Sequence, residues 1–221
     1  MTSERDGIER LTFVHREVYR SVYLCYGSFD GYGRTVLKRP ELKAHIAQVA
    51  AHLFYEQGIH AVGVDRIADE AQITKRTLYH HYPSKDELIA AALRVAPIVS
   101  FPREGTPTER ILGAFEMVAQ FLTHSHYRGC PYIIFTAEIV DRRHPARQII
   151  EQRIAKRRAW FRDAAAQAGA DNPELLSEQL DVLFDGALAS GTKREDLRPV
   201  KAALAAARAL IDSACNASHA A

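Results

Sequence analysis

Residues 73–88 read ITKRTLYHHYPSKDEL, and this stretch decides the fold. Thr74 is a favoured helix N-cap, and Pro83 interrupts the helical hydrogen bonds about two turns later. Ser84 and Glu87 then form the S-x-x-E pattern of a capping box, which starts another helix. The stretch therefore predicts a two-turn helix before Pro83 and a second helix after Ser84.

The two-turn helix carries many hydrogen-bond donors. Leu78 and Tyr82 lie on the side expected to turn inward, which leaves the polar side chains near the helix start or on its outer face. The major groove of DNA admits one α-helix and is read by Arg, Lys, Thr and His side chains, whereas Tyr, Lys and helix N-termini suit phosphate oxygens. A solvated polar face is the alternative for the segment taken alone. The predicted DNA-facing residues of this helix are Lys75, Arg76, Thr77, Tyr79, His80 and His81.

The preceding residues supply the support such a helix needs. Apolar residues at helical spacing predict a helix over about 41–57, with Gly58 at its C-cap, and their stripe is Ile46, Val49, Ala50, Leu53 and Phe54. A second, very short helix follows Gly63, with Asp65 in its first turn. Two short helices joined by a tight turn make a helix-turn-helix. Lys85, at the start of the next helix, is predicted to clamp a phosphate, and that helix is the predicted lever of any switch.

The rest of the chain is also predicted to be helical, which makes the fold class all-α. Five helices are indicated by caps, prolines and apolar periodicity: about 107–125, the apolar run YIIFTAEIV at 132–140, about 145–168, 173–191 and about 198–214. Residues 14–22 alternate in a way that suits a strand or a short helix. The predicted domains are an N-terminal extension over 1–40, a helix-turn-helix domain over 41–96, and a helical domain over 97–221.

The strings LFYEQGIHAVGV, VDRIADEA and ITKRTLYHHYPSKDEL resemble the TetR family of bacterial transcriptional regulators over about residues 42–95. The resemblance implies that the polar residues of the two-turn helix and Lys85 contact DNA, and that Gly63 and Val64 begin a helix approaching phosphate. Gly63 stands where the family commonly has Ser or Thr, and Gln72 stands where it usually has Gly. A residue with a Cβ at position 72 is expected to adopt a positive φ.

In that family the second domain binds a small effector and pairs two subunits through its last two long helices. The implied function is a repressor that leaves a near-palindromic double-stranded operator when the effector binds. Candidates for effector contact are Phe115, Val118, Phe121, Leu122, Tyr127, Cys130, Ile134, Phe135, Glu138, Trp160, Phe161 and Phe184. Candidates for the homodimer interface are Leu180, Leu183, Ala187, Leu188, Leu204, Ala207, Leu210 and Ile211. A homodimer would set two recognition helices about 34 Å apart.

The composition bears on the partners, the compartment and the metal or disulfide content of the protein. The net charge of +2 does not by itself announce a nucleic-acid partner, and no apolar run or leader pattern indicates a membrane segment or export. The cysteines, Cys25, Cys130 and Cys215, have no CxxC spacing, so neither a disulfide framework nor a thiolate metal site is indicated. We therefore expect a cytoplasmic protein with no membrane partner, no metal and no cofactor.

Three rival functions remain open in the sequence. Cys130 near a helix start, with His124, His126 and His144 nearby, allows a thiol-redox or metal sensor in which the Cys130 pKa is lowered. A Cys-dependent helical enzyme is the second rival, but it has no supporting catalytic motif, and we expect no enzyme activity. The third is a helical adaptor that binds an acidic protein through Arg153, Arg157, Arg158 and Arg162, a run that otherwise forms a solvated helix face.

Overall fold

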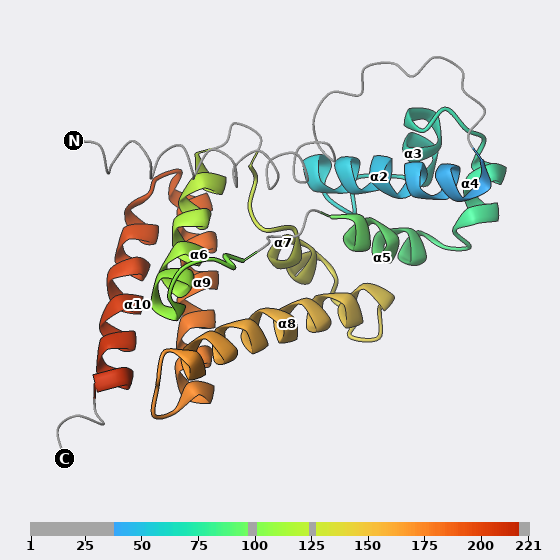
Figure 1. Ribbon diagram of the computed structural model, residues 1–221. Helices are drawn as coiled ribbons and strands as arrows, with labels where there is room; N and C mark the ends of the chain where they lie inside the picture. The colour runs from blue at the N-terminus through green and yellow to red at the C-terminus, as the bar shows by residue number, and fades with distance from the viewer. Residues whose placement is uncertain (1–37, 97–100, 124–126, 217–221) are drawn as a thin grey trace, which may run out of the picture. The chain divides into compact units, whose positions relative to one another are not determined.

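The structure is a computed structural model that describes residues 38–96, 101–123 and 127–216. Within these residues the secondary structure is entirely α-helical, which confirms the all-α prediction (Figure 1). Segment 14–22 lies outside the described residues. The helices are α2 (Arg39–Gln57), α3 (Val64–Glu70), α4 (Lys75–His81), α5 (Lys85–Val95), α6 (Pro107–Leu122), α7 (Pro131–Glu138), α8 (Pro145–Gln167), α9 (Pro173–Arg194) and α10 (Arg198–Asn216).

The chain divides into two compact units. Of the described residues, the first unit contains those up to 96 together with 138–149, and the second contains 101–137 and 150–216. The sequence assigns 138–149 to the second domain, so the return of this segment to the first unit is visible only in the structure. The predicted extension 1–40 lies outside the described residues except for its last three positions.

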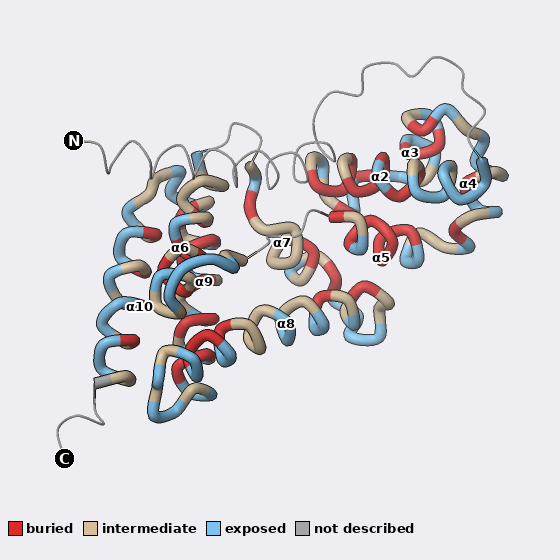
Figure 2. The backbone as a smooth tube through the Cα atoms, viewed as in Figure 1, coloured by how far each residue is buried: buried red, intermediate tan, exposed pale blue. Residues whose placement is uncertain are grey.

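Helices α2 to α5 build the first unit around the predicted apolar stripe. Helix α2 packs against α3 and α5, and α3 packs against α4. In Figure 2 the buried residues of α5 form a continuous red stretch, and those of α2 recur along the helix between exposed positions. All five stripe residues of α2 are buried, as are α5 residues at positions 88–93. Burial of this amphipathic surface stabilises helices that are too short to persist alone in water.

The predicted caps set the ends of α4 and α5. The Thr74 side chain accepts a hydrogen bond from the Thr77 backbone N–H at 3.1 Å, and Ser84 accepts one from the Glu87 N–H at 3.1 Å. Each cap satisfies a backbone donor that has no partner inside its helix. Gly63 occupies the N-cap of α3 with φ −83°, which any residue adopts, and it provides no side-chain cap. The hydroxyl that the family commonly has at this position is therefore absent.

Gln72 adopts the left-handed conformation expected from the sequence. Its φ is +55° in the turn between α3 and α4, where a Cβ is strained because it crowds the backbone. The turn is held by hydrogen bonds from the Gln72 N–H to the Asp69 carbonyl at 3.0 Å and from the Ile73 N–H to the Ala68 carbonyl at 2.9 Å. These bonds hold the helix-turn-helix geometry without the usual glycine.

An aromatic cluster forms the core of the second unit, where α6, α9 and α10 pack against one another. The rings of Phe115, Phe161 and Phe184 lie with centroids 5.9–6.2 Å apart, and all three are buried. Phe101 stacks on Trp160 with a centroid distance of 4.5 Å. Aromatic pairs at these separations add to the stabilisation provided by apolar burial.

Helix α9 continues three residues beyond its predicted end at Gly191. Gly191 is buried inside the helix, and a Cβ at this position would lie 2.2 Å from Cδ1 of Leu122. The glycine therefore allows α9 to approach Leu122 closely. The prediction of a helix end here was wrong because close packing and a C-cap both favour glycine.

We expect replacement of Gln72 by Gly to raise the free energy of unfolding by up to about 1 kcal/mol. Glycine adopts φ +55° without the Cβ penalty, which outweighs its greater entropy in the unfolded chain. Urea unfolding followed by circular dichroism measures the change.

The matched control is Gln48→Gly, because Gln48 is exposed in the interior of α2. There the same substitution should lower the free energy of unfolding by about 1 kcal/mol. A loss of stability in both variants would show that Gln72 is not strained.

Candidate nucleic-acid interface

Helix α4 is anchored by two side chains on its inner side. Leu78 is completely buried, and Tyr82, directly after the helix, is 5% exposed. The Tyr82 hydroxyl donates a 2.8 Å hydrogen bond to the backbone carbonyl of Lys43 in α2. This confirms the predicted inward orientation of Leu78 and Tyr82, and it ties the end of α4 to α2.

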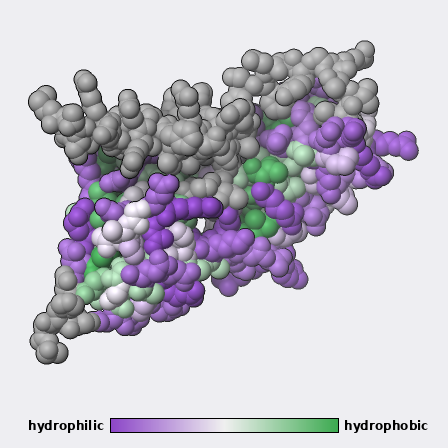
Figure 3. Space-filling view, viewed as in Figure 1, coloured by the Kyte–Doolittle hydropathy of each residue, from purple (hydrophilic) through white to green (hydrophobic). Residues whose placement is uncertain are grey.

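The opposite face of α4 is polar and open. Lys75, Arg76, Tyr79 and His80 are exposed, and Thr77 and His81 are half-buried. Gly63 is exposed and Val64 half-buried at the start of α3. The surface over α3 and α4 in Figure 3 is mainly hydrophilic. The structure therefore brings the predicted DNA-facing residues of α3 and α4 onto adjacent helices of one unit.

Lys75 is held by a carboxylate of the neighbouring helix. Its ammonium lies 2.9 Å and 3.1 Å from the two carboxylate oxygens of Asp65 in the first turn of α3. The hydrogen bond and charge of Asp65 raise the pKa of Lys75. Because both groups are exposed, the pair adds little to the stability of the fold.

Helix α2 places two cations, Arg39 and Lys43, beside α4. The sequence did not predict this proximity. Arg39 Nη2 lies 2.9 Å from His80 Nε2, and the Lys43 ammonium lies 5.4 Å from the centre of the Tyr82 ring. The pKa of His81 is lowered by burial and then by the charges of His80, Arg39 and Lys43. The predicted inward orientation of Tyr82 could have indicated this proximity, since an inward tyrosine at the end of α4 must contact another helix.

Lys85 does not project freely from α5. Its ammonium lies 5.9 Å from the centre of the Phe54 ring, and burial lowers its pKa despite the opposing effects of Asp86 and Glu138. The predicted phosphate clamp is thus half-buried, with its ammonium beside Phe54. To reach a phosphate, the side chain would have to leave this cation–π contact.

Comparison with known proteins agrees with this geometry. Residues 46–92 match the model of the bacterial regulatory proteins of the tetR family. A structure from Streptomyces avermitilis, assigned to the TetR transcriptional regulators, is 33% identical with a TM-score of 0.70, and the match covers 78% of this chain and 97% of that one. This chain belongs to the TetR family.

Further relatives within the TetR family differ in the direction of regulation. The transcriptional activator FasR of Mycolicibacterium smegmatis is 34% identical over 51% of this chain and 54% of its own length. The repressor KstR2 of Mycobacterium tuberculosis is 29% identical over 57% of this chain and 65% of its own length. The TetR-family regulator SCO4454 of Streptomyces coelicolor has a TM-score of 0.72 at 27% identity, covering 80% of this chain and 97% of that one.

The matches thus span just over half to two thirds of these curated relatives. All four proteins named are transcriptional regulators, in agreement with the expectation that the chain is a regulator and not an enzyme. TetR-family regulators bind DNA operators and usually dimerise. In the described part of this chain, no helix is both long enough and apolar enough to span a membrane.

Apart from Glu138, the predicted effector residues fall into two groups in this TetR-family member. Five form part of the protein's own core: Phe115, Val118, Phe135, Phe161 and Phe184. Six are half-buried: Phe121, Leu122, Tyr127, Cys130, Ile134 and Trp160. The half-buried group includes the stacked pair of Phe121 and Tyr127, whose ring centroids are 5.9 Å apart. Four of this group, Leu122, Tyr127, Cys130 and Trp160, pack against the core cluster of the second unit.

Glu138 has a role that the sequence did not reveal. Its carboxylate accepts a 2.7 Å hydrogen bond from the Ile59 backbone N–H, and its backbone carbonyl lies 3.0 Å from His60 Nε2. The next turn of the segment is also held in the first unit, since His144 Nε2 lies 3.3 Å from an Asp86 carboxylate oxygen in α5. Glu138 therefore joins the α2–α3 connection rather than the aromatic cluster of the second unit.

Most residues of the predicted dimer interface pack inside a single subunit. Leu180, Ala187, Leu188, Ala207 and Ile211 are at most 4% exposed in the core of the second unit, so they are not available to a partner. Leu183, Leu204 and Leu210 are half-buried. The sequence pattern identified the apolar side of α9 and α10, but that side faces the core of the same chain.

The structure also bears on the features behind the thiol-sensor and metal-sensor alternatives. Burial raises the pKa of Cys130, contrary to the lowering expected at a helix start, because desolvation of the thiolate outweighs its backbone hydrogen bonds. Among the described residues, no three metal-binding side chains converge, while His124, His126 and Cys25 lie outside them.

The basic run of α8 is paired inside the second unit. Arg157 lies 2.5 Å from Asp181 and 2.9 Å from Asp185, and Arg158 pairs with Glu178 of α9. Arg153 donates to the Tyr132 hydroxyl at 3.1 Å, and Arg162 pairs with Asp163. These contacts contradict a free cationic surface for an acidic partner.

Proposed function

We propose that this chain is a one-component transcriptional repressor that acts in the bacterial cytoplasm. A homodimer binds a near-palindromic operator through α4 and leaves it when a small effector binds the second unit. The observation that carries this proposal is the two-sided character of α4. Its inner side is locked by Leu78 and Tyr82, while its outer side presents donors at the spacing of a single helix face.

The chemistry of that outer face suits duplex DNA. Arg76 and His80 offer donors to the acceptors of base edges in the major groove, and Lys75 exchanges Asp65 for phosphate. Arg39 and Lys43 of α2 place further positive charge beside the end of α4. The net charge of +2 is therefore a poor measure of the positive potential near α4. Many of the remaining cations are paired with carboxylates within the second unit.

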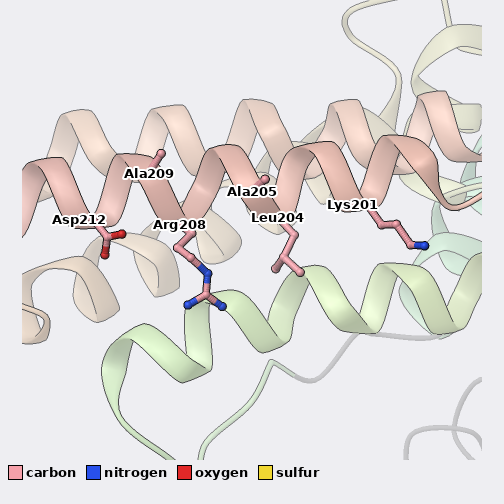
Figure 4. Close-up of a pocket in the computed structure, with 6 residues that line it drawn as sticks. All are labelled: Lys201, Leu204, Ala205, Arg208, Ala209 and Asp212. Atoms are coloured by element: carbon pink, nitrogen blue, oxygen red, sulfur yellow. The ribbon is translucent and has the colours of Figure 1, made fainter.

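We assign the subunit contact to the exposed side of α9 and α10 rather than to their buried side. A hollow of about 430 Å³ runs along α10 and is lined by Lys201, Leu204, Ala205, Arg208, Ala209 and Asp212 (Figure 4). Small alanines permit close helix approach, and a two-fold axis lets Arg208 of each subunit meet Asp212 of the partner subunit. On α9, Val182 is a large apolar side chain that is 69% exposed.

Effector binding is assigned to the half-buried side chains of the second unit. Cys130 and Ile134 belong to this group and lie at the start of α7, while the last residue of that helix, Glu138, is hydrogen-bonded to Ile59 in the first unit. A ligand that displaces the start of α7 therefore acts on the α2–α3 connection through eight residues of helix. Release requires the ligand to favour the DNA-incompetent state, because equal affinity for both states shifts nothing.

Removal of two donors tests the recognition helix. We expect Lys75→Ala/Arg76→Ala to weaken binding to a duplex selected from random sequences by about tenfold or more, with a shallower salt dependence. Fluorescence anisotropy across a salt series measures both. The matched control is Lys193→Ala/Arg194→Ala, an exposed cation pair at the end of α9. Equal affinity in the two double variants would remove α4 from the DNA contact.

A carboxylate on the exposed side of α10 tests the subunit contact. We expect Ala209→Glu to convert the dimer into a 24.7 kDa monomer, because the larger side chain would prevent a partner helix from packing closely against Ala205 and Ala209. Analytical ultracentrifugation reports the mass. Ala155→Glu, at an exposed alanine of α8, should remain dimeric. Dissociation of both variants, or of neither, would contradict the assignment.

The only tryptophan of the chain provides a readout for the effector. Trp160 stacks on Phe101 within the second unit, so we expect any small molecule that releases DNA to change its fluorescence over the same concentration range. Because burial raises the pKa of Cys130, we expect release not to depend on its thiolate, so Cys130→Ser should still respond to the same molecule, over a concentration range shifted by the altered contact. Loss of the response in that variant, with oxidants as the only releasing agents, would instead support the thiol sensor.

A further inference from the structure

A side-chain contact joins the first residue of α2 to the recognition helix α4. Arg39 is the first residue of α2, and His80 lies in the last turn of α4. Arg39 Nη2 and His80 Nε2 are 2.9 Å apart although the residues are 41 positions apart in sequence. Both side chains are exposed, so the contact adds little to the stability of the fold.

The chemistry of the two groups determines which atom carries the hydrogen. A guanidinium has five N–H donors and no acceptor, so His80 Nε2 must accept in this contact. An imidazole that accepts at Nε2 is neutral and carries its proton on Nδ1. Arg39 thereby selects one of the two neutral forms of His80 and leaves Nδ1–H as the remaining ring donor.

We infer that Arg39 is a positioning residue for base recognition: it holds His80 as a neutral Nδ1–H donor that reads an acceptor on a base edge. Acceptors in the major groove are N7 and O6 of guanine, N7 of adenine and O4 of thymine, whereas the cytosine amino group only donates. At one operator position, a fixed Nδ1–H donor therefore favours guanine, adenine or thymine over cytosine. A freely rotating histidine would present either a donor or an acceptor and would discriminate less.

The surroundings of His80 support this state. The His81 ring lies 5.7 Å away in an edge-to-face arrangement, and Lys43 adds positive charge from α2. Burial, and then the charges of His80, Arg39 and Lys43, lower the pKa of His81. For His80 the state is set by the contact itself, because a donor-only guanidinium 2.9 Å from Nε2 requires that nitrogen to accept.

The inference rests on the proposed DNA function and is tested by a double-mutant cycle on base preference. Arg39→Ala, His80→Ala and the double variant of the full chain are compared on a selected duplex and on duplexes changed at single positions. We expect Arg39→Ala and His80→Ala each to reduce discrimination at the same position by about fivefold to tenfold. The double variant should lose no more than His80→Ala alone, because Arg39 acts through His80.

Lys43→Ala is the matched control, since Lys43 lies on the same helix near the same end of α4. It should weaken binding to all duplexes equally and reduce the salt dependence, without changing base preference. The inference is overturned if Arg39→Ala behaves like Lys43→Ala, or if its effect adds to that of His80→Ala. Failure of the proposed function itself would be distinct, because the unmodified chain would then select no duplex.

Discussion

A seven-residue helix does not hold its shape in water, so everything that α4 does depends on its attachment to the rest of the first unit. That attachment is the burial of Leu78 together with the Tyr82 side chain and its hydrogen bond to α2. The Thr74 cap and the Gln72 turn set where the helix begins, but they do not orient it. Because the anchors occupy one side, the donors are confined to the other, and α4 presents them as a rigid set.

A second constraint comes from the segment at 138–149, which the chain contributes to the first unit after passing through the second. Glu138 satisfies the Ile59 backbone N–H next to the end of α2, and His144 contacts the first turn of α5. These bonds connect the segment to the α2–α3 connection and to the first turn of α5. The covalent path from the half-buried aromatic side chains therefore ends on the support of the recognition helix. In the proposed release mechanism, α7 is therefore a route of coupling in addition to α5.

Local patterns were reliable where one physical cause determines the residue type. The caps at Thr74 and Ser84, the apolar stripe of α2 and the positive φ of Gln72 each follow from backbone chemistry within a few residues. Gly191 shows the opposite case, since close packing against Leu122 and a helix end select the same residue. Cys130 is similar: its position at a helix start favours the thiolate, but burial by residues distant in sequence disfavours it more strongly.

The sequence by itself determined the all-α class, the helix-turn-helix and the outward set of donors on α4, because these depend on helical periodicity and on the chemistry of side chains near one another in the chain. Only the tertiary structure decided which partners those side chains meet. Lys75 faces Asp65, Lys85 lies against Phe54, and Arg39 reaches His80. It also showed that the apolar side of α9 and α10 belongs to the core of one subunit, which moves the proposed subunit contact to the opposite face. Periodicity reveals that a helix has an apolar side, but the identity of what covers that side depends on contacts between distant segments.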